Sequence, residues 1–279
     1  MRRIPAKLSP ATFPTSHGGI EMDTWNPSQY DKFLREREQP FFDLLTLIEP
    51  VPEMHVVDLG CGTGKLTRVL HNTLQAPHTI GIDRSERMLH VAMSNGATPG
   101  LRFELGEIEA FAAEAEYDLI FSNAVFQWVG NHEGLISRLF SALKPGGQLA
   151  FQLSAMDDNP SHTVAEALTS EPPFRPAFLD WRNPLRSLTP GEYSRLLHRA
   201  GFAQQHVRLV IYPHLLPSRQ DVIEWMKGSL LTAYEKRLTP DQFDNFLEEY
   251  GKRLIPQLDS ERPFFFPFER ILCWARRSG

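Results

Sequence analysis

The chain has 279 residues, a formal net charge of -5 and 42% hydrophobic residues, a composition typical of an ordinary globular protein. No stretch approaches the roughly 18–20 apolar residues of a membrane span, and the first residues lack the apolar segment of a secretory signal. The acidic balance argues against nucleic acid as a partner, because nucleic-acid-binding proteins carry basic patches. Cys61 and Cys273 are the only cysteines, so we expect a cytoplasmic protein with reduced thiols and no disulfide framework.

The N-terminal residues differ in character from the rest. Residues 1–24 predict a poorly ordered leader, because they are rich in Pro, Ser, Thr and Gly and have few periodic apolar positions. Residues 25–50 predict a helical cap, because their apolar residues recur mostly at three- and four-residue intervals. Pro40 is expected to interrupt the cap helix.

From residue 55 onward, short buried strands alternate with single helices. The predicted strands are 55–59, 78–82, 101–104, 117–122 and 148–153, and the predicted helices are 65–72, 86–94 and 135–143. Alternation at this spacing is typical of βαβ units in a parallel sheet. The sequence therefore predicts an α/β protein with a doubly wound sheet.

The pattern loosens after Ser154 into a Pro-containing connection that reaches about Leu188. Thr189 and Pro190 then have the residue types of an N-cap and a first helical position, and Gly201 follows the end of that helix. Residues 205–212 alternate as a strand, residues 218–254 are mainly helical, and residues 268–275 are the last strand. We expect seven mostly parallel strands in a core of residues 51–217 and 262–279, with a helical lid, 218–261, inserted before the last strand.

A glycine-rich segment, DLGCGTG (58–64), joins the first strand to the first helix of the core. Its glycines let the backbone approach a ligand closely, and the N–H groups of the following helix would point at that ligand. The spacing differs from the dinucleotide fingerprint G-x-G-x-x-G and from the P-loop. The turn indicates a nucleotide-like ligand, although such turns also occur in proteins that bind nothing.

Polar side chains end the next three strands. Asp83 ends the second strand, where a carboxylate accepts hydrogen bonds from ribose hydroxyls in doubly wound sheets. Glu107 and Ile108 follow the third strand and offer an acceptor for an adenine amine and an apolar surface for its ring, and Asn123 ends the fourth strand. Because the carboxyl ends of parallel strands meet at one edge, these residues predict one ligand crevice.

Four motifs, in this order, resemble those of class I S-adenosylmethionine-dependent methyltransferases. They are VVDLGCGTG (56–64), GID (81–83), YDLIFSNAVFQWV (117–129) and LKPGGQL (143–149). Within that class, WNPSQYDKFLREREQP (25–40), NAVFQW (123–128), YPHLLPS (212–218), the Trp225 helix and PFERILCWARR (267–277) are similar to the trans-aconitate methyltransferase family. The resemblance implies a Rossmann-like methyltransferase fold. It is loose over 155–188, and the family's Arg-containing G-L-R-P-like run is here LLTA (230–233).

The resemblance implies transfer of a methyl group from S-adenosyl-L-methionine to a small-molecule carboxylate, giving a methyl ester and S-adenosyl-L-homocysteine. A carboxylate is already ionised at neutral pH, so we assign no catalytic base, and catalysis reduces to alignment and exclusion of water. No metal-ligand spacing stands out, and no metal is expected. We expect a monomer or homodimer with no nucleic-acid or membrane partner.

The family resemblance and the strand-end positions together assign site residues. The expected cofactor contacts are Asp58, Gly60 and Gly62 for the methionine part, Asp83 for the ribose, Met88, Ile108 and Glu107 for the adenine, Asn123 near the sulfonium, and Tyr30, Arg37 and Arg84. The candidates that orient the reacting groups are Gln127, Trp128, Tyr212 and His214. The candidates for acceptor binding are Trp128, Arg182, Arg186, Tyr212 and His214. For the tryptophan the alternative is an ordinary core position, and for the arginines a solvated surface. Trp225, Met226 and Tyr234 are expected in the core of the lid.

Three other functions remain open from the sequence. The acceptor atom could be an O, N or C of a larger apolar metabolite, which the aromatic run Phe264-Phe265-Phe266 would suit. A module that binds S-adenosylmethionine without catalysis is disfavoured by the intact glycines and acidic residues. A nicotinamide oxidoreductase is disfavoured by the shifted glycine spacing.

Overall fold

The computed structural model describes residues 34–181 and 187–279. The predicted leader and the first part of the predicted cap lie outside the described residues. The predicted division of the chain into a core and a lid stays a prediction. The predicted strands and helices can be compared directly with those of the structure.

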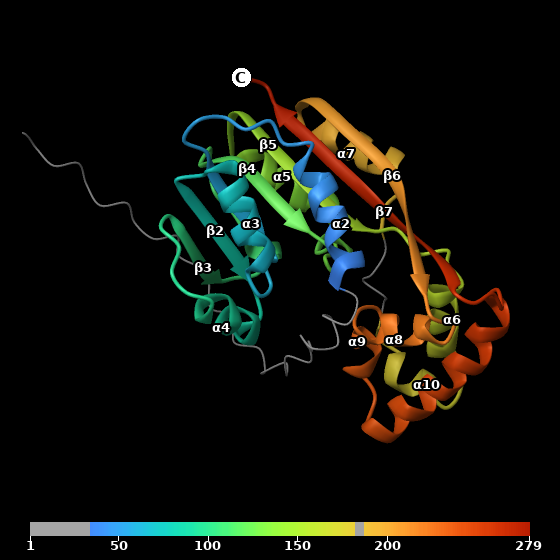
Figure 1. Ribbon diagram of the computed structural model, residues 1–279. Helices are drawn as coiled ribbons and strands as arrows, with labels where there is room; N and C mark the ends of the chain where they lie inside the picture. The colour runs from blue at the N-terminus through green and yellow to red at the C-terminus, as the bar shows by residue number, and fades with distance from the viewer. Residues whose placement is uncertain (1–33, 182–186) are drawn as a thin grey trace, which may run out of the picture.

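Seven strands form one sheet in the order β3-β2-β1-β4-β5-β7-β6 (Figure 1). Neighbouring strands are parallel except at β7, which runs antiparallel to β5 and β6. The strands are β1 His55–Leu59, β2 His78–Asp83, β3 Leu101–Leu105, β4 Tyr117–Asn123, β5 Leu143–Ser154, β6 Phe202–Leu216 and β7 Phe264–Arg277. The predicted seven-stranded, mostly parallel α/β sheet is confirmed.

The direction in which the chain adds strands reverses between β1 and β4. The chain runs from β1 outward through β2 to β3 and then returns to place β4 on the other side of β1. In doubly wound sheets, ligands bind at the carboxyl ends of the two strands that flank such a reversal. The glycine-rich turn after β1 and the segment after β4 therefore face each other across the expected ligand crevice.

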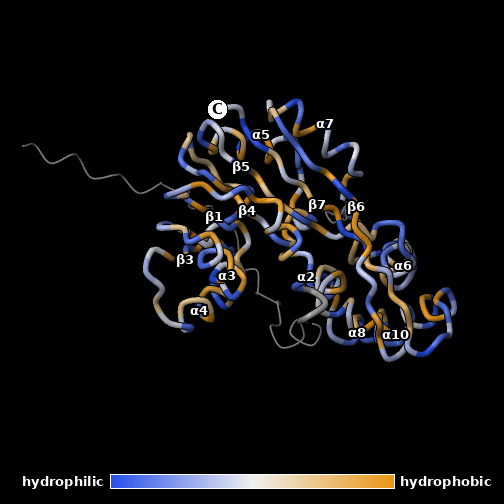
Figure 2. Tube along the Cα trace, turned by 45° about the horizontal axis from the view of Figure 1, so that its top comes forward, coloured by the Kyte–Doolittle hydropathy of each residue, from blue (hydrophilic) through white to orange (hydrophobic). Residues whose placement is uncertain are grey.

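Helices cover both faces of the sheet. α2 (Leu34–Leu45) and α3 (Lys65–Leu74) share a buried hydrophobic cluster with one face, which includes Phe41, Leu70, Phe121 and Trp274. α5 (His132–Ala142) and α7 (Pro190–Ala200) share another cluster with the opposite face. α4 (Glu86–Ser94) packs along β2 and β3. In Figure 2, hydrophobic residues run along β4 and β7, where the two layers of helices meet the sheet.

A second helical layer gathers around the far ends of β6 and β7 (Figure 1). It contains α6 (Pro160–Thr169), α8 (Asp221–Lys227), α9 (Thr232–Glu235) and α10 (Pro240–Leu254), with the short 3-10 helices η3 (Arg175–Phe178) and η4 (Ile255–Gln257). Trp225, Met226 and Tyr234 are fully or almost fully buried in its hydrophobic cluster, so their predicted core role is confirmed. We call this group of helices the lid.

The segment after Ser154 differs from the predicted loose connection. It contains α6, whose Val164, Ala165 and Leu168 are buried in the lid cluster. Asn159 caps α6 with its side chain and Pro160 occupies the first turn. The predicted lid thus has an additional helix, which the prediction had placed in the connection.

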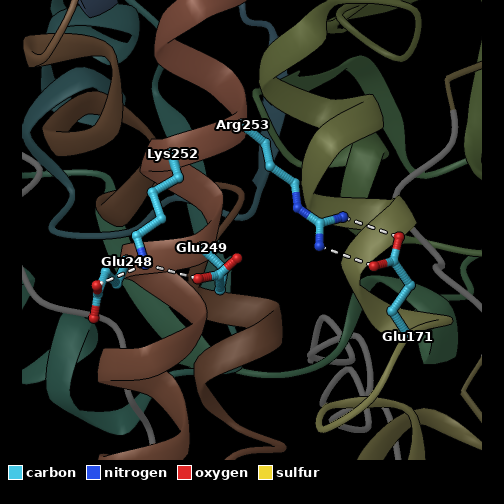
Figure 3. A network of polar contacts seen from close by, with 5 residues as sticks. All are labelled: Glu171, Glu248, Glu249, Lys252 and Arg253. Carbon is cyan, nitrogen blue, oxygen red and sulfur yellow. Dashed lines mark hydrogen bonds and ion pairs between the residues drawn. The ribbon is translucent and has the colours of Figure 1, made fainter.

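The lid is also held by charged pairs on its outer surface (Figure 3). Arg253 of α10 donates two hydrogen bonds, both 2.9 Å long, to the carboxylate of Glu171, which follows α6. Lys252 pairs with Glu248 and Glu249 of its own helix at 2.8 and 2.9 Å. The fork of Arg253 fixes α10 relative to the segment after α6, whereas the Lys252 pairs are local to one helix.

Pro40 does not interrupt the cap helix, in contrast to the prediction, because α2 continues from Leu34 to Leu45 through it. A proline inside a helix costs about 3 kcal/mol. Phe41 and Leu44, which follow it, are completely buried against the sheet, and each buried side chain of this size contributes about 1.5–3 kcal/mol. Tertiary packing therefore offsets the local cost.

The predicted helix start at Thr189 is confirmed in detail, and α10 begins in the same way. Thr189 and Glu192 form a capping box at α7, and Thr239 and Gln242 form one at α10. Gly201 ends α7 with φ 102°, a conformation that favours glycine. Among the described residues, no helix is both long and apolar enough to span a membrane.

Candidate functional site

The glycine-rich turn is fixed to the neighbouring strand by backbone hydrogen bonds. The N–H groups of Gly60 and Cys61 donate to the carbonyl oxygen of Ile82 at 2.7 and 3.0 Å. The N–H of Gly62 donates to Oδ2 of Asp83 at 2.7 Å. The turn after β1 and the end of β2 therefore form one rigid unit.

Two of the glycines are required for different reasons. Gly60 has φ 80°, and a Cβ there would collide with the side chain of Val125, which follows β4. Gly62 has φ 55°, and a Cβ there would meet no atom within 4 Å. The turn thus packs against the far side of the strand reversal at Gly60 and leaves open space beside Gly62, which suits close approach of a ligand to backbone.

Asp58, the fourth residue of β1, carries a buried acceptor that none of the described residues satisfies. Its side chain is 4% exposed, and its Oδ2 accepts a hydrogen bond of 2.6 Å from the Thr67 hydroxyl. Within the described residues its Oδ1 is buried without a hydrogen-bond partner. Burial raises the pKa of Asp58 to about 7, the Thr67 hydrogen bond opposes this shift, and the charge of Asp83 adds to it.

Asp83 organises the start of α4 as well as the glycine turn. Its Oδ1 accepts a 2.9 Å hydrogen bond from the N–H of Ser85, whose hydroxyl in turn accepts one from the N–H of Met88. A carboxylate oxygen can accept more than one hydrogen bond. These bonds fix the orientation of the Asp83 carboxylate at the strand end, where the sequence predicts a contact to ribose.

The predicted adenine contacts lie beside Asp83. The N–H of Gly106 donates to the carbonyl oxygen of Asp83 at 3.0 Å, which brings the end of β3 next to the end of β2. Met88 and Ile108 are buried, whereas Glu107 and Arg84 are exposed. The structure therefore brings the two apolar candidates and the two charged candidates to the same edge of the sheet.

At the end of β4, Asn123 begins a row of polar side chains that crosses the sheet. The Nε2 of Gln152 on β5 donates to Oδ1 of Asn123 at 2.6 Å. The Nη1 of Arg270 on β7 donates to Oε1 of Gln152 at 3.0 Å. We call Asn123, Gln152 and Arg270 the polar row.

The sequence-based prediction missed two members of the polar row. Gln152 is completely buried and Arg270 is 6% exposed. The available signal was the apolar residues beside them, Phe151 and Leu153 for Gln152 and Ile271 and Leu272 for Arg270, because a polar side chain among buried apolar neighbours needs a partner. Their partners, however, are distant in sequence and appear only once β7 is placed beside β5.

The short helix η2 (Phe126–Trp128) follows β4 and carries two predicted residues. The Nε2 of Gln127 donates to the carbonyl oxygen of Ala124 at 2.9 Å, and in the described part of the chain its buried Oε1 has no partner. Trp128 is partly buried against the lid cluster. The end of β4 thus joins the strand reversal to the lid.

Tyr212 and His214 are two residues apart on the buried face of β6 and contact different elements. The Tyr212 hydroxyl donates to Oδ2 of Asp43 on α2 at 2.8 Å, and burial raises the pKa of Tyr212. His214 is buried and its ring stacks on Trp225 of the lid with a centroid distance of 4.8 Å. Tyr212 thus links the cap helix to the sheet, and His214 lies at the junction of sheet and lid. That either residue contacts the acceptor stays a prediction.

Some predicted residues are not described. Tyr30, Arg182 and Arg186 lie outside the described residues, and so does the side chain of Arg37, whose backbone belongs to α2. Over residues 34–181 and 187–279, no group of three or more His, Cys, Asp or Glu side chains is arranged to hold a metal ion. Cys61 and Cys273 are both buried free thiols.

The residues at the strand ends fit an adenosylated amino acid. The open side of Gly62 leaves room for a ligand to approach the backbone. The Oδ1 of Asp58, without a partner among the described residues, could accept a hydrogen bond from an ammonium group, and the oriented carboxylate of Asp83 could accept hydrogen bonds from hydroxyls. Each of these three features is expected for one part of S-adenosylmethionine.

A family model described as a methyltransferase domain matches residues 50–201. The chain is 36% identical over 260 residues to the trans-aconitate 2-methyltransferase of Deinococcus radiodurans, covering 91% of this chain and 98% of that protein. It is also 36% identical over 262 residues to the enzyme of the same name from Variovorax paradoxus, covering 90% of this chain and 95% of that protein.

Solved structures show the same fold. An S-adenosylmethionine dependent methyltransferase from Mesorhizobium loti aligns with a TM-score of 0.51 and 23% identity, covering 86% of this chain and 98% of that one. A putative methyltransferase solved in a complex with a Haloferax volcanii methyltransferase activator aligns with a TM-score of 0.58 and 16% identity, covering 91% of this chain and 95% of that one.

Proposed function

Because this chain belongs to the trans-aconitate 2-methyltransferase family, we propose that it methylates a carboxylate of a small polycarboxylic acid of the trans-aconitate type. It is an S-adenosylmethionine-dependent methyltransferase. The products would be the methyl ester of the acid and S-adenosylhomocysteine.

The reaction needs alignment more than acid or base chemistry. When bound, S-adenosylmethionine supplies an electrophilic methyl group on a sulfonium. A carboxylate oxygen of the acid would accept this methyl group as the C–S bond breaks, so that the charges of the sulfonium and of the reacting carboxylate cancel and leave a thioether and an ester group. No proton moves, because a carboxylate is ionised at neutral pH. The contribution of the protein is to position the acid in line and to exclude water.

The cofactor residues are proposed from their places in the site. Asp58, Gly60 and Gly62 would hold the methionine part, Asp83 the ribose, and Met88, Ile108 and Glu107 the adenine, with Arg84 at the same edge. Asn123 would lie near the sulfonium, with Gln127 and Trp128 beside the acceptor. The observation that carries this proposal is the buried Oδ1 of Asp58, which has no hydrogen-bond partner among the described residues, on the strand that leads into the glycine-rich turn. A carboxylate so placed suits the ammonium group of an amino acid.

The aromatic lid gives little support to the alternative of a larger apolar acceptor. Phe264 and Phe266 are 4% and 1% exposed and pack within the lid cluster, so they do not line an open apolar surface. Phe265 is exposed and pairs in register with the exposed Leu215 of β6, so these two side chains face outward and do not line an enclosed pocket. The acid acceptor is therefore the better supported of the two.

Methyl transfer from labelled S-adenosylmethionine tests the proposal. The acceptors are trans-aconitate, other compact di- and tricarboxylates, longer-chain acids and phenols. We expect turnover to be confined to the compact polyacids, and the labelled product to be an ester that mild alkali hydrolyses. Turnover of bulky apolar acceptors alone would contradict the proposed acceptor while leaving the methyltransferase assignment in place.

A cytoplasmic location and a monomeric or homodimeric state are proposed together with this function. Two buried free thiols support a reducing compartment. Sedimentation of the purified protein would decide the oligomeric state, and a larger assembly would contradict the proposal.

A further inference from the structure

The segment that carries Gln127 and Trp128 is bounded by two residues in a left-handed conformation. Ala124, directly after β4, has φ 59°, and Asn131, the N-cap of α5, has φ 49°. Such values are uncommon for residues other than glycine and persist where the surrounding contacts hold them. Residues 124–131 therefore depend on contacts with other elements to keep this conformation.

One of these contacts reaches the segment from α5. The Nε2 of His132, the first residue of α5, lies 2.9 Å from the carbonyl oxygen of Phe126, the first residue of η2. His132 is 7% exposed and Phe126 is completely buried, so the contact is shielded from water, where a hydrogen bond is stronger than in solvent. The helix itself is fixed, because Leu135, Ile136 and Leu139 are buried in the core.

A second contact decides which ring nitrogen of His132 carries the proton. The carbonyl oxygen of Phe126 can only accept, so the Nε2 of His132 donates to it. Burial lowers the pKa of His132, which keeps the ring neutral at neutral pH and leaves its Nδ1 as an acceptor. The hydroxyl of Tyr193 on α7 lies 3.0 Å from this Nδ1 and donates to it. Tyr193 therefore holds His132 in the tautomer that binds Phe126.

The position of η2 matters to both sides of the site. Its N-cap, Val125, abuts the glycine-rich turn, since a Cβ at Gly60 would lie 2.1 Å from Cγ2 of Val125. Its last residue, Trp128, packs against the lid cluster. A shift of the Phe126 backbone would therefore displace a segment that lies between the glycine-rich turn and the lid.

We propose that His132, oriented by Tyr193, is a positioning residue for methyl transfer, whose hydrogen bond to Phe126 holds η2 in place. This inference rests on the proposed function, in which Gln127 and Trp128 of η2 lie beside the acceptor. Both ring nitrogens of His132 bind protein atoms, so His132 acts through η2 and not on the reacting atoms. A misplacement of about 1 Å costs a catalysed rate about 100-fold.

Two replacements of His132 separate its bond to η2 from its contribution to stability. In His132→Gln the side-chain amide extends to the place of Nε2 and can still donate to the Phe126 carbonyl. In His132→Asn the shorter amide lies at the place of Nδ1 and can meet Tyr193 alone. Both variants lose the same buried ring, so we expect similar losses of stability.

His71 provides a matched control on the opposite face of the sheet. It is 6% exposed, and its Nδ1 lies 2.9 Å from the hydroxyl of Thr79. Thr79 is the second residue of β2, at the amino end of that strand. His71→Asn therefore makes the same replacement of a buried, hydrogen-bonded ring at the edge of the sheet away from the site.

Four measurements are compared for each protein. Urea unfolding gives the stability, initial rates with trans-aconitate give kcat and KM, and calorimetry gives the Kd for S-adenosylhomocysteine. Fluorine NMR of protein labelled with fluorotryptophan and saturated with S-adenosylhomocysteine reports the surroundings of Trp128, whose signal is assigned with Trp128→Phe. The NMR measurement does not depend on which acceptor the enzyme uses.

We expect His132→Asn to lower kcat by about 10- to 100-fold and to shift the Trp128 signal. The Kd for S-adenosylhomocysteine should stay within about threefold of wild type, because the proposed cofactor contacts lie mainly at other strand ends. His132→Gln should recover most of kcat and the wild-type signal. His71→Asn should lose stability and keep both. Tyr193→Phe should lower kcat by about 2- to 10-fold, the range for one hydrogen bond.

Other results overturn the role of His132. These are equal losses of kcat in His132→Gln and His132→Asn, a loss in His71→Asn as large as in His132→Asn, or an unshifted Trp128 signal in His132→Asn. If His132→Asn does not fold, Tyr193→Phe decides, and an unchanged kcat with an unchanged Trp128 signal refutes the proposal. If the wild type methylates other acceptors and not trans-aconitate, the proposed function fails, and the Trp128 signal still decides the role of His132.

Discussion

At the scale of single residues, Asp58 is the clearest case of a side chain whose ionised form is disfavoured by burial in the fold. Its pKa of about 7 against an ordinary 3.8 means that the folded protein holds this proton more tightly than the unfolded chain does. The contribution of Asp58 to stability is therefore greatest below pH 3.8 and is lost as the pH rises to about 7. Because Asp58 loses its contribution to stability near neutral pH, its presence at a buried position is better explained by ligand binding than by folding.

The first prediction concerns the stability of Asp58→Asn without ligand. The difference in unfolding free energy between this variant and wild type should shift in favour of the variant between about pH 5 and 7, by at most about 1.4 kcal/mol per pH unit, and become constant above that range. Urea unfolding at a series of pH values measures it. A difference that does not change between pH 5 and 7 would contradict the raised pKa.

A second prediction follows for ligand binding. An ammonium group beside Oδ1 favours the ionised form of Asp58, so binding of S-adenosylhomocysteine at pH 6.5 should release a proton from this side chain. Calorimetry in two buffers of different ionisation enthalpy counts the protons. Proton release should be smaller in Asp58→Asn, and equal release in both proteins would remove Asp58 from the methionine site.

A third prediction separates the two tasks of Asp83. Asp83→Ala removes the acceptor for ribose and the bonds to Gly62 and Ser85, so cofactor binding should weaken by about 1.5–3 kcal/mol. Asp83→Asn keeps one acceptor oxygen and should lose less. The exposed Glu86, in the first turn of α4, gives the control Glu86→Gln. Unchanged affinity of Asp83→Ala in titration calorimetry would refute the ribose assignment.

At the scale of elements, the cap helix is held by polar contacts at both sides. Tyr212 of β6 donates to Asp43, and Lys65 at the start of α3 pairs with Glu38 at 2.5 Å. The Tyr212 bond is shielded, because the tyrosine is 5% exposed, whereas Lys65 is exposed. The first contact should therefore matter more for the position of α2 than the second.

This contrast gives a fourth prediction. Tyr212→Phe should increase hydrogen exchange of the α2 amides and leave the β1 and β4 amides protected, because it removes one shielded hydrogen bond between α2 and the sheet. Lys65→Gln, which removes the exposed pair, is the control and should have little effect. Exchange in α2 that is the same in Tyr212→Phe and wild type would show that the apolar contacts of Phe41 and Leu44 hold the helix alone.

The elements also show what the sequence can predict. The strands next to the site, the glycine turn and the capping boxes were predictable because their signals lie within a few residues. The helix α6 was missed although Asn159, Pro160 and the spacing of Val164 and Leu168 were available, because prolines farther along the segment suggested a loop. The error at Pro40 had another cause, since tertiary packing outweighed a local helix breaker.

The candidate site divides in the same way. Asp58, Asp83 and Asn123 end or approach the ends of strands and belong to recognisable motifs, so their positions could be inferred. The polar row could not, because Gln152 and Arg270 are 118 residues apart in sequence and meet only through the register of β5 with β7. That register depends on the antiparallel return of the last strand, which no local pattern specifies.

At the scale of the whole molecule, β6 and β7 join two separately packed regions. The strands pair from Phe202 and Arg277 to Leu216 and Phe264. The end with Phe202 and Arg277 lies in the sheet, whereas Leu216 and Phe264 at the other end are buried in the lid cluster. The proposed cofactor residues lie at the strand ends of the sheet, and Trp128 of η2 and His214 of β6 pack against the lid.

This division gives the last prediction, which concerns Trp225 at the centre of the lid. Trp225 is 1% exposed and contacts His214, Phe266 and Phe268. Trp225→Ala should destabilise the lid by about 3–5 kcal/mol, the usual cost of truncating a buried aromatic. Phe265→Ala is the control, because Phe265 lies on β7 beside Phe266, which contacts Trp225, and is 49% exposed.

Limited proteolysis and calorimetry together check the effect of Trp225→Ala. Because the lid has its own hydrophobic cluster, we expect faster cleavage between residues 218 and 262 and a large loss of methyl transfer, while the Kd for S-adenosylhomocysteine stays near that of wild type. Phe265→Ala should match wild type in all three measurements. An equal loss of cofactor binding in Trp225→Ala would show that lid and sheet form one cooperative unit, since a lid that folds separately cannot weaken a site built entirely from strand ends of the sheet.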